Sequence, residues 1–429
     1  MEKQLVIGIQ ERPSNFGKWL ALSFQHVFAM FGATVLVPIL TGLDVGVALV
    51  ASGVGTLIYI ASTKGKVPVY LGSSFAYIGA IIAAGSVNGF SSAYVGLITV
   101  GLIYVVVALV IKFVGSEWLK KLLPPVVIGP MIMIIGLGLA SVATGQAGIN
   151  PSHPDLAFLT TDWRNPVIAL VTFLTVVVIA LKAKGFYQIV PFLIAIFVGY
   201  LFGVILGVVD LGAAFSGAKF INAPNFEFIG TYTLDFSAVL MFAPIAFVTI
   251  AEHIGDHTVL GEICDKDFIT DPGLDKTLMG DGIATAVSAM LGGPANTTYG
   301  ENTGVVAMTK VGSVYVTGLA AIIAILLGFL GYIQAFIASI PLPVMGGIAL
   351  VLFGLIAGNG VKVLIKAKVD LFNMRNLIIV ATMLVIGIGS ASFPINDAVA
   401  LQGMSLAAIV GILLNGFFHL LDKIGPTNN

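Results

Sequence analysis

The chain has 429 residues, of which 58% are hydrophobic and only 10% are Asp, Glu, Lys or Arg, and its mean hydropathy is +1.05. Soluble globular chains carry roughly 25% charged residues, so a soluble protein is excluded, and the high apolar content excludes a disordered one. The net charge of −1 offers no basic surface for nucleic acid, and the one cysteine excludes an internal disulfide. This composition is typical of a polytopic membrane protein.

Residues 1–18 are polar and contain five charged residues, which predicts a cytoplasmic N-terminal segment ahead of an uncleaved first span. Apolar stretches of about the length that spans a bilayer then follow one another, about fourteen in all. They are expected near 19–40, 45–62, 67–84, 93–113, 122–143, 165–182, 186–208, 237–261, 279–293, 299–309, 312–331, 342–361, 376–392 and 402–420. The predicted fold class is therefore an all-α polytopic membrane protein.

The basic residues divide unequally between the two sets of connecting loops. With a cytoplasmic N-terminus, 18 of the 20 basic residues lie on the cytoplasmic side, and only Arg164 and Lys219 lie on the other. Cytoplasmic loops of membrane proteins are enriched in Lys and Arg, and a miscount by one span would destroy the partition. We therefore expect an even number of spans and two cytoplasmic termini.

A weak internal repeat links the two halves of the chain. Five residues recur at one constant offset: Pro125, Val126, Gly129, Gly136 and Leu137 match Pro343, Val344, Gly347, Gly354 and Leu355. Residues 70–73 of the third stretch likewise match 298–301 of the tenth, and both are interrupted by Gly or Pro. These matches pair span n with span n+7, which predicts two inverted seven-span repeats, with short extended strands in spans 3 and 10. Chance recurrence in Gly-rich helices is the alternative.

Acidic residues inside the apolar stretches are candidates for function. Glu252 and Asp256 share one face of the eighth stretch, where two carboxylates in a low dielectric resist double ionisation, a suitable arrangement for a proton carrier. The alternative is a set of solvated charges at a cytoplasmic helix end. Glu301 follows the break in the tenth stretch and is expected to bind a ligand, or else to cap a half-helix. We expect only these three acids to lie where water is scarce.

Several motifs together resemble the nucleobase–ascorbate transporter family. Residues 301–310 (ENTGVVAMTK) match the family signature, and further matches occur at 25–34, 71–76, 251–253 and 341–347. The similarity covers nearly the whole chain and is strongest to the bacterial members that carry uracil together with protons. One departure is Asp256, where some of these relatives have a histidine, with His257 one place later.

The resemblance implies a core domain that holds the substrate and a gate domain that moves against it. The core domain would comprise 19–113 (spans 1–4) and 236–335 (spans 8–11), and the gate domain 114–210 (spans 5–7) and 336–421 (spans 12–14). The implied substrate-binding residues are Glu252 and Glu301 through their carboxylates, Phe75 and Gly300 through their amides, and Ser74, Tyr299 and Ala33 in the pocket. The residues implied in proton coupling are Glu252, Asp256 and Glu301.

The sequence as a whole predicts a transporter, not an enzyme, that imports uracil across the bacterial inner membrane by proton symport. No phosphate-binding Gly-Lys-Ser/Thr loop is present, so ATP drive is unsupported. The expected partners are uracil, protons and the lipid bilayer, with a homodimer as one expected assembly and with no cofactor, metal or nucleic acid. A purine (xanthine or urate) permease, an anion transporter of the same architecture and, last, an intramembrane enzyme are the alternatives.

Overall fold

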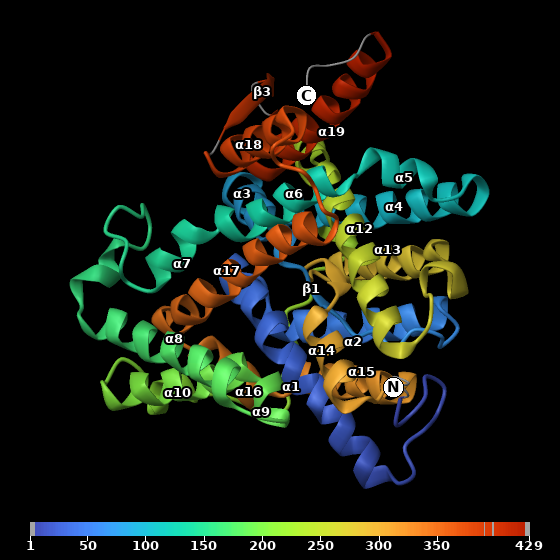
Figure 1. The fold of residues 1–429 in the computed structure, drawn as a ribbon. Coiled ribbons are helices and arrows are strands. Elements are labelled where there is room, and N and C mark those ends of the chain that lie inside the picture. Colours follow the sequence, from blue (N-terminus) through green and yellow to red (C-terminus); the bar gives the residue numbers. More distant parts are fainter. Residues whose placement is uncertain (1–4, 390, 397–398, 425–429) are drawn as a thin grey trace.

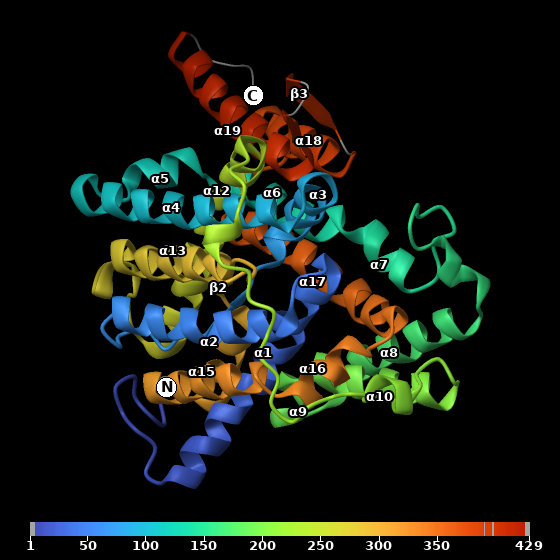
Figure 2. The same ribbon diagram turned by 180° about the vertical axis from the view of Figure 1, so that it is seen from behind.

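The computed structural model describes residues 5–389, 391–396 and 399–424, which are mostly helical (Figures 1 and 2). The elements of the first half are α1 (Phe16–Thr41), α2 (Val45–Ser62), β1 (Leu71–Ser73), η1 (Phe75–Tyr77), α3 (Ile78–Asn88), α4 (Phe90–Val114), α5 (Glu117–Leu122), α6 (Pro125–Gly138), α7 (Ala140–Gln146), η2 (Ala157–Thr161), α8 (Arg164–Lys182), α9 (Phe186–Ile189), α10 (Pro191–Ile205) and α11 (Leu211–Ala214). Those of the second half are η3 (Ile229–Thr231), α12 (Phe236–Cys264), η4 (Ile269–Gly273), α13 (Leu274–Met290), β2 (Asn296–Thr298), α14 (Gly300–Thr309), α15 (Val314–Gly328), α16 (Gly331–Ala338), α17 (Leu342–Lys366), α18 (Met374–Ile388), β3 (Ser392–Asn396), β4 (Val399–Gln402) and α19 (Gly403–Ile424).

Eight helical segments of the described chain are long and apolar enough to cross a membrane. They comprise α1, α2, α4, α6 continued through α7, α8, α12, α17 and α19. Shorter apolar segments lie at the start of α3 and in α10, α15 and α18. Each of the predicted apolar stretches contains a helix, so the prediction of a helical, multi-pass membrane protein is confirmed.

The outer faces of several helices carry large apolar side chains that no other part of the described chain covers. On α4, Leu102, Val106 and Phe113 are 54%, 58% and 79% exposed, and α8 presents Leu170 and Val178 in the same way. Such continuous apolar faces are unfavourable in water but match the hydrocarbon of a bilayer. These faces are therefore suited to contact with lipid.

The helices pack in two groups; in both views α4, α13, α2 and α15 form one stack, and α8 and α10 lie on the opposite side of the molecule (Figures 1 and 2). In the first group, α4 packs on α13, α2 on both α13 and α15, and α1 and α12 flank them. In the second group, α6 packs on α17, α8 and α10 pack on one side of α17, and α18 and α19 pack on each other and on α6. The groups meet mainly where α12 contacts α19 and α6, and where α1 contacts α10.

Glycines allow the closest helix crossings within each group. A Cβ atom placed on Gly101 of α4 would lie 2.6 Å from the carbonyl oxygen of Gly282 on α13. In the second group, a Cβ on Gly360 of α17 would lie 2.5 Å from the carbonyl oxygen of Gly129 on α6. Small residues at these crossings let the backbones approach closely, as is usual for helices packed in a membrane.

Two short antiparallel strand pairs interrupt the helices. β1 pairs with β2 in the register Leu71↔Thr298, Gly72↔Thr297 and Ser73↔Asn296, deep inside the first helix group. β3 pairs with β4 between α18 and α19, with Phe393 opposite Leu401. The first pair joins segments far apart in sequence, and it coincides with the two segments whose Gly and Pro residues predicted extended chain.

Candidate functional site

The β1–β2 pair is held by hydroxyl and amide side chains from the two helices beside it. Ser52 Oγ of α2 donates to the carbonyl oxygen of Leu71 at 2.7 Å, and the amide of Leu71 donates to Thr56 Oγ1 at 2.9 Å. On the other strand, Thr285 Oγ1 of α13 donates to the carbonyl oxygen of Asn296 at 2.8 Å. Backbone at membrane depth must satisfy its polar groups internally, and these side chains do so where no helix can.

Tyr299 closes one side of the strand pair. Its hydroxyl donates to the carbonyl oxygen of Ser73 at 2.8 Å and accepts from Thr34 Oγ1 of α1 at 3.2 Å. Its ring lies against Gly72, where any side chain would collide with it. Tyr299 therefore connects β2 to both β1 and α1, and its own position is fixed from two sides.

Phe75 and Gly300 each begin a helix directly after a strand. Phe75 is the first residue of η1, and Gly300 is the first residue of α14. The first N–H groups of a helix have no partner within the helix and carry its positive dipole end. The two ends of the ladder thus each supply backbone donors, with Ser74 and Tyr299 as the residues that join strand to helix.

The three acids predicted as site residues come together beside the strand pair. Asp256 of α12 accepts a hydrogen bond from Thr298 Oγ1, the last residue of β2, at 3.2 Å between Oγ1 and Oδ2. Glu301 lies in the first turn of α14, which packs on α12, and it is within electrostatic range of both Glu252 and Asp256. All three are half-buried, so their carboxylates lie in a shielded region that still has access to a ligand.

Ser74 and Phe75 directly follow β1. Ser74 is 1% exposed, and its hydroxyl has no hydrogen-bond partner among the described residues. Phe75 is half-buried, and it borders a cavity of about 260 Å³ between α3 and α12 of the first group and α6, α18 and α19 of the second. Ala33 belongs to α1, but its side chain lies outside the described part of the structure.

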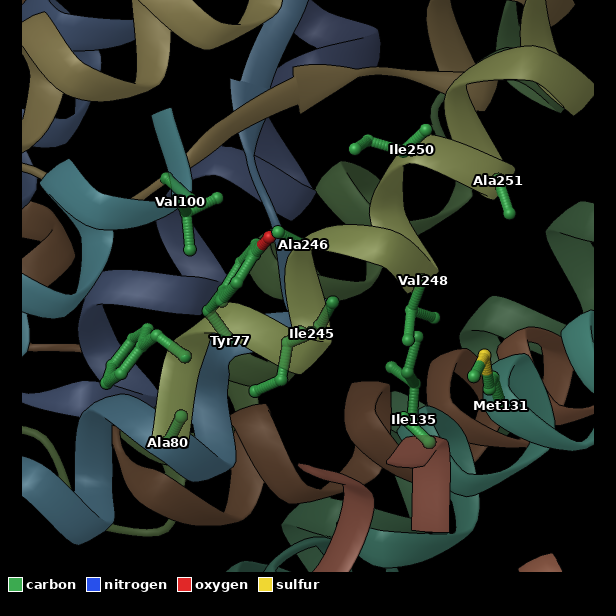
Figure 3. Packing of buried hydrophobic residues seen from close by; sticks show 14 of the residues in the cluster. Tyr77, Ala80, Val100, Met131, Ile135, Ile245, Ala246, Val248, Ile250 and Ala251 are labelled. Carbon is green, nitrogen blue, oxygen red and sulfur yellow. The ribbon is translucent and has the colours of Figure 1, made fainter. Parts of the chain in front are cut away.

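Apolar packing fixes the part of α12 that precedes Glu252 and Asp256. Figure 3 shows Ile245 and Ala246 beside Tyr77 of η1, and Val248 directed toward Ile135 of α6. The Tyr77 hydroxyl also bonds to Thr249 Oγ1 of α12 at 2.7 Å. The helix that carries Glu252 and Asp256 is therefore fixed to η1 on one side and touches the second helix group on the other.

The expectation that only three acids are shielded from water is wrong, because Asp281 of α13 is fully buried. Its Oδ2 lies 2.6 Å from Nδ1 of His253 on α12, which is also fully buried. The sequence signal was present, since Asp281 falls inside the apolar stretch expected at 279–293, but periodicity alone could not show its partner. His253 and His257 are both hydrogen-bonded and buried.

His26 of α1 is hydrogen-bonded to the signature segment 301–310. Asn302 Nδ2 of α14 donates to His26 Nδ1 at 3.1 Å and to its carbonyl oxygen at 3.2 Å. This pair connects α1 to the first turn of α14, next to Glu301. The residues described in the structure contain no cluster of His, Cys, Asp and Glu that could hold a metal ion.

Comparison with known sequences places the chain among permeases. A family model described as "Permease family" matches residues 17–395. The uracil permease of Bacillus caldolyticus is 49% identical over 413 residues, covering 96% of this chain and 94% of that protein. The uracil permease of Bacillus subtilis (strain 168) is 44% identical over 420 residues, 96% of this chain and 95% of that one. The uracil permease of Escherichia coli (strain K12) is 42% identical over 422 residues, covering 98% of this chain and 95% of that protein.

Solved structures share the fold at much lower sequence identity. The transmembrane domain of the cyanobacterial bicarbonate transporter BicA superposes with a TM-score of 0.64 at 16% identity, covering 95% of this chain and 98% of that one. The murine anion transporter Slc26a9 in its inward-facing state superposes with a TM-score of 0.70 at 11% identity, covering 96% of this chain and 69% of that one. Identities this low establish a membrane transporter fold and nothing further.

The sequence resemblance to nucleobase carriers, strongest to those for uracil, is thus confirmed along nearly the whole chain. Because the family model matches 17–395 and uracil permeases are 42–49% identical over at least 96% of the chain, this protein is a member of the permease family.

Proposed function

We propose that this protein imports uracil across the bacterial inner membrane by proton symport through alternating access. One observation carries the proposal. Glu252, Asp256 and Glu301 meet beside the β1–β2 pair in a chain that is 49% identical to a protein named uracil permease.

The chemistry of uracil suits the groups at this place. Uracil is planar and neutral, with two N–H donors and two carbonyl acceptors. Carboxylates of Glu252 and Glu301 would accept from the N–H groups, and backbone amides of Phe75 and Gly300 would donate to the carbonyl oxygens. Ser74 contributes a hydroxyl that has no other partner among the described residues, and Tyr299 and Ala33 would shape the pocket. No cofactor takes part in this scheme.

The arrangement of the helices supports fourteen spans in two inverted repeats. If span n corresponds to span n+7, the packing of α4 on α13 corresponds to that of α15 on α2, and both pairs are in contact. The same rule relates the packing of α10 on α8 to that of α19 on α18. It also relates the α2 hydroxyls that bind β1 to the α13 hydroxyl that binds β2.

The two helix groups would serve as core and gate domains. The proposed core domain is 19–113 with 236–335, and the proposed gate domain is 114–210 with 336–421. Because the substrate groups belong to the core domain, rocking it against the gate domain would expose uracil first to one side and then to the other. Both termini, with the segment 1–18, would be cytoplasmic, as the distribution of basic residues indicates. A homodimer remains the proposed assembly.

Uracil accumulation in proteoliposomes tests this function. Purified protein in vesicles should accumulate labelled uracil when an imposed pH gradient makes the outside acidic, equally with and without sodium. Excess xanthine or urate should not compete; competition would instead indicate a purine permease. Transport of bicarbonate or chloride without uracil transport would indicate an anion carrier. Accumulation of no pyrimidine would refute the proposal.

Replacement of Glu252 by Gln tests its part in coupling. Loss of a charge-assisted hydrogen bond costs roughly 1.5–3 kcal/mol, so Glu252→Gln should lower uracil uptake by about tenfold or more and flatten its dependence on pH. Asp155→Asn, at an exposed loop position, is the control and should transport like the unmodified protein. Uptake by Glu252→Gln at the normal rate with the normal pH profile would remove this residue from the mechanism.

A further inference from the structure

A chain of buried polar side chains runs beside the candidate site without belonging to it. Asp281 Oδ2 lies 2.6 Å from His253 Nδ1. The Nδ1 of His257 lies 2.7 Å from the carbonyl oxygen of His253, and its Nε2 is hydrogen-bonded to the Tyr59 hydroxyl of α2. All four residues are at most 1% exposed. Burial of so many titratable groups is costly and calls for a function.

The partners define where protons sit in this chain. A carbonyl oxygen can only accept, so His257 carries its proton on Nδ1 and, when neutral, its Nε2 accepts from the Tyr59 hydroxyl. Asp281 and His253 together are neutral when they hold one titratable proton, either as an ion pair or as acid and base. Without it the pair carries one buried negative charge, which is unfavourable.

Two atoms of the chain are left able to exchange a proton. His253 Nε2 and Asp281 Oδ1 are buried and have no hydrogen-bond partner among the described residues. The rings of His253 and His257 are stacked, with 3.9 Å between their centroids. A positive charge on one imidazole therefore disfavours a positive charge on the other, so the two rings hold at most one extra proton at a time.

His257 also borders a surface cavity at the far end of α12. It lines a cavity of about 400 Å³ whose other walls include the exposed residues Thr258, Glu262, Asp265, Lys266 and Asp267. His257 is thus the buried wall of a surface cavity and, at the same time, a member of the buried chain. The proposed topology places this end of α12 in the cytoplasm.

We propose that Asp281, His253, His257 and Tyr59 form the route by which the coupled proton leaves the substrate site for the cytoplasm. This inference rests on the proposed function. When the protonated carboxyl of the site acid, Glu252 or Asp256, turns to reach His253 Nε2, its O–H bond breaks as an N–H bond forms there, and Asp281 stabilises the imidazolium. The two rings then turn out of their stack, the N–H bond at His253 Nε2 breaks as one forms at His257 Nε2, and the Tyr59 hydroxyl turns its own hydrogen away. Water at the surface cavity finally accepts it.

Other titratable groups surround this route and belong to its electrostatics. Those on neighbouring elements and within electrostatic range of Asp281 are Tyr77 of η1 and Tyr104 of α4. Glu301 of α14 acts on the site acids, and Glu262, Asp265, Lys266 and Asp267 line the outlet. The lysine at the outlet would repel an emerging proton, whereas the three acids would attract it.

Separate measurement of exchange and net uptake tests the route. Exchange of internal unlabelled uracil for external labelled uracil needs no proton release, whereas uptake driven by a pH gradient does. Tyr59→Phe and His257→Asn should each slow net uptake by about tenfold or more while leaving exchange within about twofold. Asn retains a donor for the His253 carbonyl oxygen, so His257→Asn removes the titratable ring and not that hydrogen bond. Tyr200→Phe, which loses a buried hydroxyl bonded to Ser339 Oγ away from the route, should change neither activity.

Each outcome decides between the route and a structural role. Equal loss of exchange and net uptake in both variants, whether by misfolding or by poor binding, would overturn the route, and so would net uptake at the normal rate. Loss of net uptake in Tyr200→Phe as well would show that removal of any buried hydroxyl slows transport, and it would also contradict the route. If the unmodified protein exchanges no uracil, the proposed function itself fails, which is a different result.

Discussion

Asp281 and His253 form a buried pair in which each side chain supplies the hydrogen-bond partner of the other. Both are fully buried and lie 2.6 Å apart across α12 and α13. Removing one member of a buried pair leaves an uncompensated polar group, which costs more than the pair itself contributes. The same reasoning applies to Asn302 and His26, whose hydrogen bonds connect α14 to α1.

Truncation of Asp281 should therefore destabilise the protein strongly. Asp281→Ala leaves His253 Nδ1 without its partner, and we expect a loss of roughly 3–5 kcal/mol in unfolding free energy. Thermal unfolding of the detergent-solubilised protein measures the loss. Asp155→Ala, at an exposed loop position, should stay within about 0.5 kcal/mol. An unchanged unfolding temperature for Asp281→Ala would show that the pair contributes little to stability.

At the scale of elements, close helix crossings decide where the strands can lie. The β1–β2 pair receives its hydrogen bonds from α2 and α13, so these helices must approach it closely. Their positions depend in turn on crossings such as that of α4 over α13, where Gly101 faces the backbone of Gly282 and Ala286. The backbone of α13 cannot move aside as a flexible side chain can, so a side chain at Gly101 would be overpacked.

Adding one methyl group at Gly101 tests how closely α4 and α13 are packed. Gly101→Ala should cost about 1–3 kcal/mol by overpacking, although alanine is the better helix former. Gly354→Ala on α17, where a Cβ would meet nothing within 4 Å, should be neutral or stabilising by up to about 1 kcal/mol. The two unfolding temperatures, measured under the same conditions, give the comparison. Equal behaviour of both variants would show that the crossing has room to adjust.

At the scale of the whole molecule, two helix groups meet along a limited boundary. One contact across it is the hydrogen bond from Ser405 Oγ of α19 to the carbonyl oxygen of Met241 on α12, at 2.6 Å. The cavity of about 260 Å³ that Phe75 borders lies at the same boundary. Movement of one group against the other would open and close this space, which is what alternating access requires.

A cross-link across the boundary should stop transport. With Cys264 replaced by Ala, oxidation of a Met241→Cys, Ser405→Cys pair should abolish uracil uptake but not uracil binding, and reduction should restore uptake. The matched pair Ser23→Cys, Val316→Cys joins α1 and α15 inside one group, where Ser23 Oγ donates to the Val316 carbonyl oxygen at 3.0 Å. Its oxidation should leave uptake intact. Full uptake by the cross-linked first pair would argue against relative movement at this boundary.

Much of the fold was predictable because a membrane-spanning helix can be recognised from a continuous apolar stretch of sufficient length. The stretch 45–62 matches α2 at both ends, and β1 and β2 lie within the segments 67–75 and 292–302, whose Gly and Pro residues indicated extended chain followed by helix. Glu252, Asp256 and Glu301 were found because charge is rare in such stretches. Asp281 was overlooked, although it too lies in an apolar stretch, because no local pattern pairs it with His253 twenty-eight residues earlier.

The sequence by itself determined that this is a membrane protein. It also determined which segments are helical and to which family the chain belongs. These properties depend on composition, apolar length and motifs, all of which are local. Only the tertiary structure decided that β1 pairs with β2, that Asp256 binds Thr298, and that Tyr59 and His257 connect a buried acid to a surface cavity. Those contacts join residues up to 227 positions apart, and their existence depends on how helices cross, which no single segment encodes.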